Sequence, residues 1–177
     1  MRQIVTTVII ALAVLATCPV GALAQSGPGE GRETLARALR GASLPLESGL
    51  TASSGVGTPL SGKYEIDDGA FQLSVYTWKV DAVSGDSFTE VIVDYSTGNV
   101  SKVETITDGG DLAAAQSQKA AMARAKRSLA EATAAAVKAN AGYRAVIATP
   151  SLEAGAPVAE VTLVKGDDWK VVTERLD

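Results

Sequence analysis

The stretch KYEIDDGAFQLSVYTWKV, residues 63–80, decides the fold class. Asp68-Gly69 is a typical two-residue hairpin turn, and the segments on either side of it alternate between apolar and polar side chains. In the second segment the apolar residues that share one face are Phe71, Leu73 and Val75. This pattern predicts an antiparallel sheet, and the same reasoning adds strands at 88–95 and 100–106.

The sequence before and after this sheet predicts helices. Apolar spacing indicates short helices at 33–40 and 44–54. Fourteen of the 29 residues at 113–141 are alanine, which is a strong helix signal. Ser128 and Glu131 have the spacing of a capping box, so this stretch is expected to divide into two helices near Ser128. Three more strands are expected after it, at 143–149, 157–165 and 169–174.

The order of these elements suggests an internal duplication, because both halves read helix, strand, hairpin, strand, hairpin, strand. Short identities recur in the same order, among them Gly69-Ala70 with Gly155-Ala156 and Gly85-Asp86 with Gly166-Asp167. The expected fold class is therefore α+β, with units at 33–107 and 111–177, each with one or more helices packed on a small antiparallel sheet. The residues expected in the core are Leu73, Val75, Ile92, Leu129, Val137, Val161 and Leu163.

Both halves resemble the PepSY domain. The first half carries GKYEIDDGAFQLSVYT and then FTEVIVDYSTGNV, a hydrophobic strand that ends in aspartate before a Thr-Gly turn. The second half carries SLAEATAAAVKANAGYRAVIATP and then GAPVAEVTLVKGDDWKVVTERLD, and together the two matches cover 33–177. The resemblance implies a helix on a curved antiparallel sheet in an exported bacterial protein. It also implies a role in restraining peptidases, and no catalytic residues.

The N-terminal segment has the pattern of a secretory signal peptide. Arg2 precedes an apolar run, and Ala22-Leu23-Ala24 is typical of a cleavage site, so 1–24 is expected to be removed and 25–32 to form a flexible leader. The expected location is the bacterial periplasm or the medium, with no stable membrane insertion after cleavage. Two alternatives stay open, an uncleaved membrane anchor and lipidation at Cys18.

Composition excludes several kinds of catalytic and metal site. The chain has no histidine and one cysteine, Cys18, which rules out His-based triads, thiolate catalysis in the mature chain and Cys- or His-based zinc sites. The segment 57–63 fits G-x-x-x-x-G-K, but Tyr64 follows where a phosphate loop has a hydroxyl that binds magnesium. A net charge of −4 argues against nucleic acid. We therefore expect no enzyme activity, no cofactor and no metal.

Three aromatic residues are candidates for binding a partner: Tyr76, Trp78 and Trp169. Packing in the core is favoured for them, and exposed anchoring of a partner is the alternative. A second candidate is the last strand, 169–174, as a sheet edge that pairs with an extended segment. Charges on that strand at Lys170, Glu174 and Arg175 oppose this, and Val172→Pro is the expected way to block the edge.

These expectations combine into one function with two rivals. The favoured reading is a non-catalytic exported binding module that modulates or inhibits a peptidase or another envelope protein. One rival is a periplasmic module that binds a small molecule or an ion through the acidic turns at Asp67-Asp68, Asp108/Asp111 and Asp167-Asp168. The other is a structural protein of the envelope.

Overall fold

The computed structural model describes residues 28–83 and 85–177, so the predicted signal peptide lies outside the described residues. The helices are α1 (Pro28–Ala38), the 3₁₀ turn η1 (Leu39–Gly41), α2 (Leu46–Ser53), α3 (Gly109–Met122) and α4 (Leu129–Ala139). The strands are β1 (Thr58–Asp67), β2 (Ala70–Asp81), β3 (Gly85–Val93), β4 (Val100–Thr105), β5 (Arg144–Glu153), β6 (Ala156–Lys165) and β7 (Asp168–Arg175). Helix α1 begins five residues before the predicted start, within the segment assigned to the leader. None of the helices in the described residues combines the length and the hydropathy of a membrane span.

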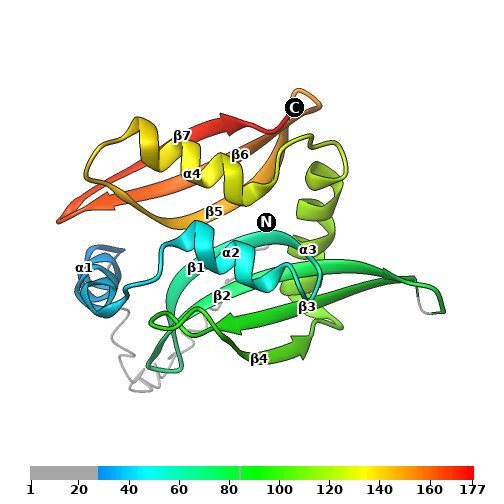
Figure 1. Cartoon of the computed structure of the whole chain (residues 1–177), viewed down its shortest axis with the longest axis horizontal. Helices are drawn as coiled ribbons and strands as arrows, with labels where there is room; N and C mark the ends of the chain where they lie inside the picture. Colours follow the sequence, from blue (N-terminus) through cyan, green and yellow to red (C-terminus); the bar gives the residue numbers. More distant parts are fainter. Residues whose placement is uncertain (1–27, 84) are drawn as a thin grey trace, which may run out of the picture.

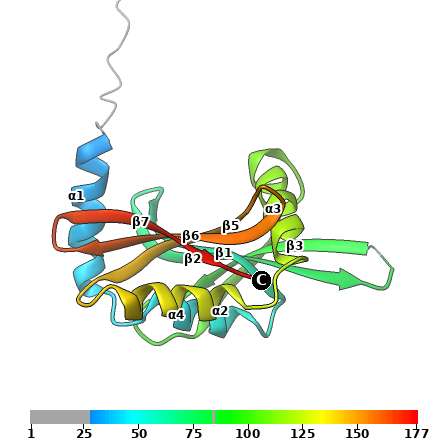
Figure 2. The ribbon, with the colours of Figure 1, turned by 90° about the horizontal axis from the view of Figure 1, so that it is seen from above.

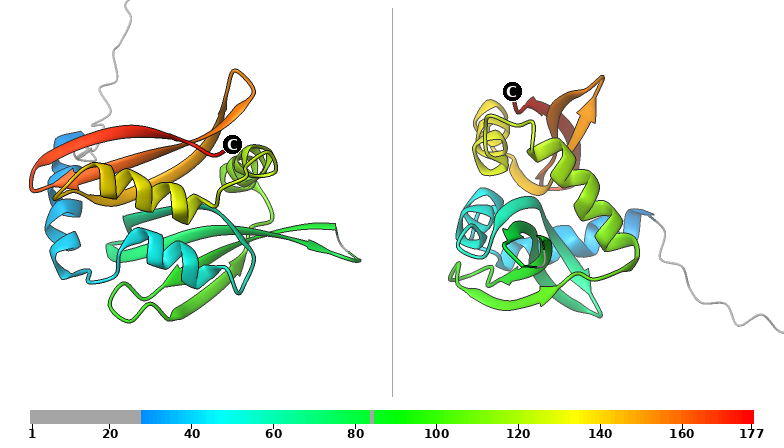
Figure 3. Two further views of the ribbon diagram at one scale, coloured as in Figure 1. Left: turned by 45° about the horizontal axis from the view of Figure 1, so that its top comes forward. Right: turned by 90° about the vertical axis from the view of Figure 1, so that its right-hand side faces the viewer.

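The strands form one antiparallel sheet in the order β4-β3-β2-β1-β5-β6-β7, with β4 and β7 at opposite margins (Figures 1 and 3). The α+β class is as predicted, but the expectation of two separate small sheets is wrong. Strands β1 and β5 join the halves through two residue pairs, Gly62↔Ala148 and Lys63↔Ile147. The joint escaped prediction because 55–62, rich in glycine with one proline, indicated a loop, whereas β1 starts at Thr58 and has a bulge after Pro59.

Helices α2 and α4 lie side by side on one face of the sheet, and α3 lies on the other face (Figure 2). Two glycines permit the close approach of α2. A Cβ on Gly49 would lie 2.3 Å from Leu73 Cδ2, and a Cβ on Gly62 would lie 2.9 Å from Leu50 Cδ2. The main core lies largely between α2, α4 and the sheet, and it continues through Leu39 of η1 and Val164 toward α1. A smaller core lies under α3 and consists of Leu60, Tyr76, Phe88 and Ala115.

Five of the seven predicted core residues are buried: Leu73, Val75, Leu129, Val161 and Leu163. Val137 is partly buried against the same core. The prediction for Ile92 is wrong, because the register pairs Leu73 with Val93 and Val75 with Val91. Cross-strand partners share a face, so Ile92 points to the opposite face beside Ser74.

The alanine-rich stretch divides as predicted. Ser128 Oγ accepts a hydrogen bond from the Glu131 backbone N–H, and the Glu131 carboxylate accepts one from the Ser128 N–H, which completes the capping box. The same hydrogen bond from the Ser128 backbone, followed by that from its hydroxyl, lowers the pKa of Glu131. The break sends α3 and α4 to opposite faces of the sheet.

Candidate partner-binding surface

Tyr76 is a core residue of the smaller cluster under α3. Only 7% of its surface is exposed, and its hydroxyl donates to Asp111 Oδ1 at 2.7 Å, which fixes β2 to the first turn of α3. Burial, followed by the hydrogen bond to Asp111, raises its pKa. The side chain is therefore not available to a partner in this structure.

Trp78 lies next to Tyr76 and is half-buried. Its indole Nε1 donates to Asp86 Oδ1 at 2.9 Å, and Lys119 Nζ lies 4.7 Å from the ring centroid. Lys119 also binds the other oxygen of Asp86, and this contact, with the Trp78 hydrogen bond, lowers the pKa of Asp86. Trp78 thus joins the β2–β3 hairpin to α3, and its ring face and its N–H both have partners within the chain.

Trp169 stands apart from the other two aromatic residues. It is half-buried at the start of β7, where it packs against the main core, and the Arg32 guanidinium lies 5.9 Å from its ring. A cavity of about 650 Å³ beside it is lined by Arg32, Glu33, Arg40, Asp167, Asp168 and Trp169. The structure therefore brings Tyr76 and Trp78 together but not Trp169.

Strand β7 is an edge of the sheet, as the sequence predicted. Its register with β6 is unbroken from Lys165↔Asp168 to Val158↔Arg175. The next pair, Pro157 with Leu176, is hydrogen-bonded, because the Leu176 N–H donates to the Pro157 oxygen at 3.0 Å. Hydrogen-bonded and non-hydrogen-bonded pairs alternate in an antiparallel ladder. The residues whose backbone groups point outward are therefore Trp169, Val171, Thr173 and Arg175.

This alternation changes the expected position of the substitution that blocks the edge. Val172 pairs with Val161 through the ladder, so Val172→Pro would damage the β6–β7 pair rather than block the outer edge. The proline that blocks the edge belongs at Val171, whose side chain is 61% exposed. Val171 could have been found from the sequence by counting alternate residues from the Gly166-Asp167 turn.

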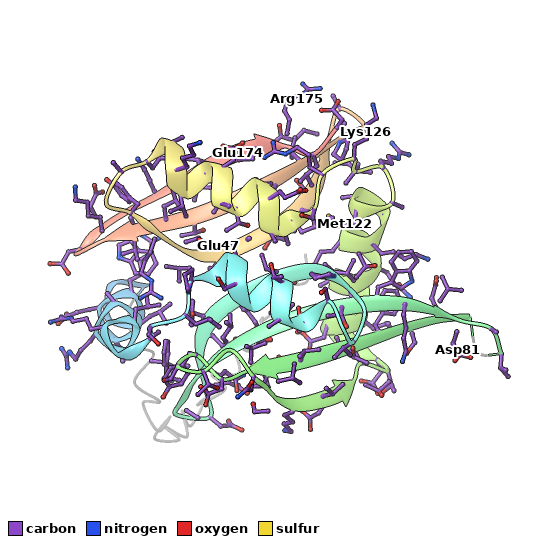
Figure 4. All side chains as sticks on the ribbon, viewed as in Figure 1. Glu47, Asp81, Met122, Lys126, Glu174 and Arg175 are labelled. Atoms are coloured by element: carbon purple, nitrogen blue, oxygen red, sulfur yellow. The ribbon has the colours of Figure 1, made fainter. Side chains whose placement is uncertain are left out.

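The charges on β7 also lie differently from what the sequence suggested. Lys170 is half-buried, with Nζ 2.6 Å from Asn140 Oδ1 and 3.9 Å from the Tyr143 ring centroid, and Glu174 lies 3.8 Å from Arg127. Both side chains lie on the face of the sheet that carries α4, and not in the plane of the sheet where the outward backbone groups lie. Glu174 and Arg175 lie near the end of β7 (Figure 4), where the Lys126 backbone N–H donates to the Leu176 oxygen. The strand thus keeps an apolar exposed residue at its centre.

No family model, curated protein or solved structure matches the chain. The candidate binding surfaces are therefore compared by their geometry alone.

The opposite edge, β4, is a weaker candidate for strand pairing. It spans six residues, and its register with β3 is interrupted by an irregularity after Ile92. Short edges and bulges hinder pairing with other chains. Its outward residues are Val103 and Thr105, since the Ile106 N–H donates to the Phe88 oxygen at 2.9 Å and fixes the alternation.

The acidic turns, which the sequence suggested as a possible ion site, are supported less well by the structure than the β7 edge is. Among residues 28–83 and 85–177, no group of three or more Asp, Glu, His or Cys side chains is placed to hold a metal ion. The Asp168 carboxylate accepts a hydrogen bond from the Tyr143 hydroxyl, and this bond is the main cause of the raised pKa of Tyr143.

Proposed function

We propose that this chain is an exported, non-catalytic module that binds a peptidase or another envelope protein through the outer edge of β7. The observation that carries the proposal is the row of outward backbone groups on β7, an eight-residue strand with a continuous register to β6. Pairing of this kind uses backbone N–H and C=O groups for affinity, so it needs no distinctive set of side chains.

We further propose that the module consists of two PepSY-like units, 33–107 and 111–177. Two features support this. In each half a helix, α2 or α4, is followed by a strand, β1 or β5, and by a hairpin whose two turn residues have positive φ. These residues are Asp68-Gly69 and Ala154-Gly155.

A peptidase is a suitable partner because its cleft binds extended substrates. An outward strand that lies in such a cleft occupies it as a substrate does, and its continuous pairing with β6 holds it in one extended conformation. Trp169 and the adjacent cavity would contact residues that flank the cleft. Inhibition would then come from occupancy and not from chemistry.

The test is inhibition of metallopeptidases exported by the same cell, measured with the purified mature chain. Val171→Pro removes an outward N–H, and Val103→Pro is the matched control because it removes an outward N–H from β4. We expect inhibition that Val171→Pro abolishes and Val103→Pro retains. No inhibition at micromolar concentrations would refute the peptidase role, and inhibition that survives Val171→Pro would refute the β7 mechanism.

Export is tested by sequencing the N-terminus of the protein from its native cell. We expect a mature chain that starts at Gln25 and is recovered from the periplasm or the medium. A chain that starts at Met1, or one that carries an acyl group on Cys18, would contradict cleavage after Ala24.

A further inference from the structure

We infer that β7 also pairs with β7 of a second copy of this chain, antiparallel, with the twofold axis at Val172. This inference rests on the proposed use of β7 as a pairing edge. It adds a specific occupant and a specific register. It also predicts that the chain regulates its own edge, because a copy and a partner protein cannot occupy the same strand at once.

The backbone of β7 is self-complementary in this register. Outward residues must face outward residues across an antiparallel pair. With the axis at Val172, Trp169 lies opposite Arg175 of the second copy, and Val171 lies opposite Thr173. All four outward residues of each strand then take part. A shift by one residue would place outward groups opposite inward ones and would break the ladder.

The charges select the same register. Lys170 lies opposite Glu174 of the second copy, and Glu174 lies opposite Lys170, so two pairs of opposite charge form across the axis. A shift by two residues in one direction places Asp168 opposite Glu174, which brings like charges together. The same shift in the other direction places Lys170 opposite the apolar Leu176. Only the register centred on Val172 pairs both charges of each strand.

The surfaces on both sides of the strand suit this pairing. On the face away from α4, Trp169 would meet the guanidinium of Arg175, the same kind of contact that Arg32 makes with it within the chain. On the α4 face, Lys170 and Glu174 are held at the strand by Asn140 and Arg127. A pairing of single strands covers less area than a standard stable interface, so we expect a reversible dimer that depends on concentration.

The experiment uses two single substitutions that reverse charge, Lys170→Glu and Glu174→Lys, in the mature chain. Each variant places like charges opposite each other in a homodimer. A mixture of the two restores opposite charges at both positions, because one copy then has two lysines and the other two glutamates. Restoration on mixing requires both variants to be folded, so it separates pairing from a failure to fold.

Sedimentation velocity over a range of concentrations gives the association state, and a mass tag on one variant identifies the heterodimer. We expect the unaltered chain to dimerise, each variant alone to dimerise at least about tenfold more weakly, and the equimolar mixture to form a one-to-one heterodimer. Val171→Pro should abolish the dimer and Val103→Pro should leave it.

Three outcomes would overturn the inference: an unaltered chain that stays monomeric at several hundred micromolar, a mixture that stays monomeric, or a dimer that survives Val171→Pro. This readout involves no peptidase. Peptidase inhibition that is sensitive to Val171→Pro, without a dimer, would refute self-pairing and leave the proposed function standing. A dimer without peptidase inhibition would support self-pairing and refute the peptidase role.

Discussion

The Arg144 guanidinium lies 5.4 Å from the centre of the Tyr64 ring, and both side chains donate hydrogen bonds to the carbonyl oxygen of Leu44. Arg144 Nη1 also donates to the carbonyl oxygens of Leu39, at 2.8 Å, and Ala42, at 3.0 Å. Tyr64 belongs to β1 and Arg144 to β5. The pair therefore fixes the segment before α2 at the point where the two halves of the sheet meet.

Replacing Arg144 with alanine should destabilise the fold strongly, because it removes a charged hydrogen-bond donor from each of three backbone carbonyls. Leu44 keeps the hydrogen bond from the Tyr64 hydroxyl and Leu39 keeps that from the Ala42 N–H, so the Ala42 oxygen loses most. Hydrogen bonds to charged groups contribute about 1.5–3 kcal/mol each in favourable cases, and we expect a loss of about 3 kcal/mol in the free energy of unfolding by urea. Tyr64→Phe is the milder control, with an expected loss of about 1 kcal/mol. Equal effects of the two substitutions would show that Arg144 is not the main tether.

Gly49→Ala should destabilise the fold even though alanine favours helix. The new Cβ would lie 2.3 Å from Leu73 Cδ2, and Leu73 is fully buried, so the Leu73 side chain must repack within the core or α2 must move away from the sheet. Overpacking of this kind costs about 1–3 kcal/mol, more than the gain of about 1 kcal/mol from helix propensity. Gly41→Ala is the matched control because its Cβ would meet nothing within 4 Å. Urea denaturation should show a loss only for Gly49→Ala.

Alkaline pH should destabilise the fold through Tyr76. Burial and then the hydrogen bond to Asp111 raise the pKa of its hydroxyl, so the folded state favours the protonated form. A group with a raised pKa contributes stability that is fully present below its unfolded value, about 10, and is lost as pH rises above it. We expect the melting temperature to fall above pH 10, and less so in Tyr76→Phe. Parallel curves for both proteins would contradict this assignment.

Acid pH should release Trp78 from Asp86. The hydrogen bond from Lys119, followed by that from Trp78, lowers the pKa of Asp86, so the contact persists above the unfolded value of about 3.9 and is lost as pH falls through the lower folded value. In a Trp169→Phe background, Trp78 is the remaining tryptophan. Its fluorescence should change with a midpoint below about 3.9, and Lys119→Met should move this midpoint upward. An unchanged midpoint would argue against the Lys119 contact.

The alternation of inward and outward backbone groups along β7 can be tested by measuring the free energy of unfolding. Val172→Pro removes a ladder hydrogen bond to β6 and should lower the free energy of unfolding by about 1–3 kcal/mol. Val171→Pro removes an N–H that faces solvent and should leave that free energy within about 1 kcal/mol. The comparison should be made at a protein concentration low enough to keep the chain monomeric. A larger loss for Val171→Pro would show that the alternation along β7 is reversed.

The strands, the hairpins and the break near Ser128 could be predicted from the sequence, because each depends on residues that are close together in the chain. The wrong prediction for Ile92 shows the limit of such local patterns. Three β-branched residues in a row, Val91 to Val93, satisfy the alternation in either phase, and only the pairing with β2 decides between them. The joint between β1 and β5 depends on residues more than eighty positions apart. Its local signs, Gly62 and Pro59, also indicate a loop.

The candidate edge followed from position in the chain, but its chemistry did not. Lys170 and Glu174 looked like charges that blunt an edge, and their contacts with Asn140 and Arg127 come from elements distant in sequence. Trp78 looked like an anchor or a core residue, and its actual partners, Asp86 and Lys119, belong to a turn and a helix whose approach no local pattern specifies.

The central position of β1 and β5 also sets an order of events during synthesis. Four strands of the sheet and helix α2 precede residue 108, so they can pair before the rest of the chain has left the ribosome. Until Ile147 and Ala148 emerge, the outer side of β1 at Gly62 and Lys63 has no strand beside it. At elongation rates of about 5–20 residues per second, the nascent chain remains open to mispairing at its future midline for roughly 4–16 s.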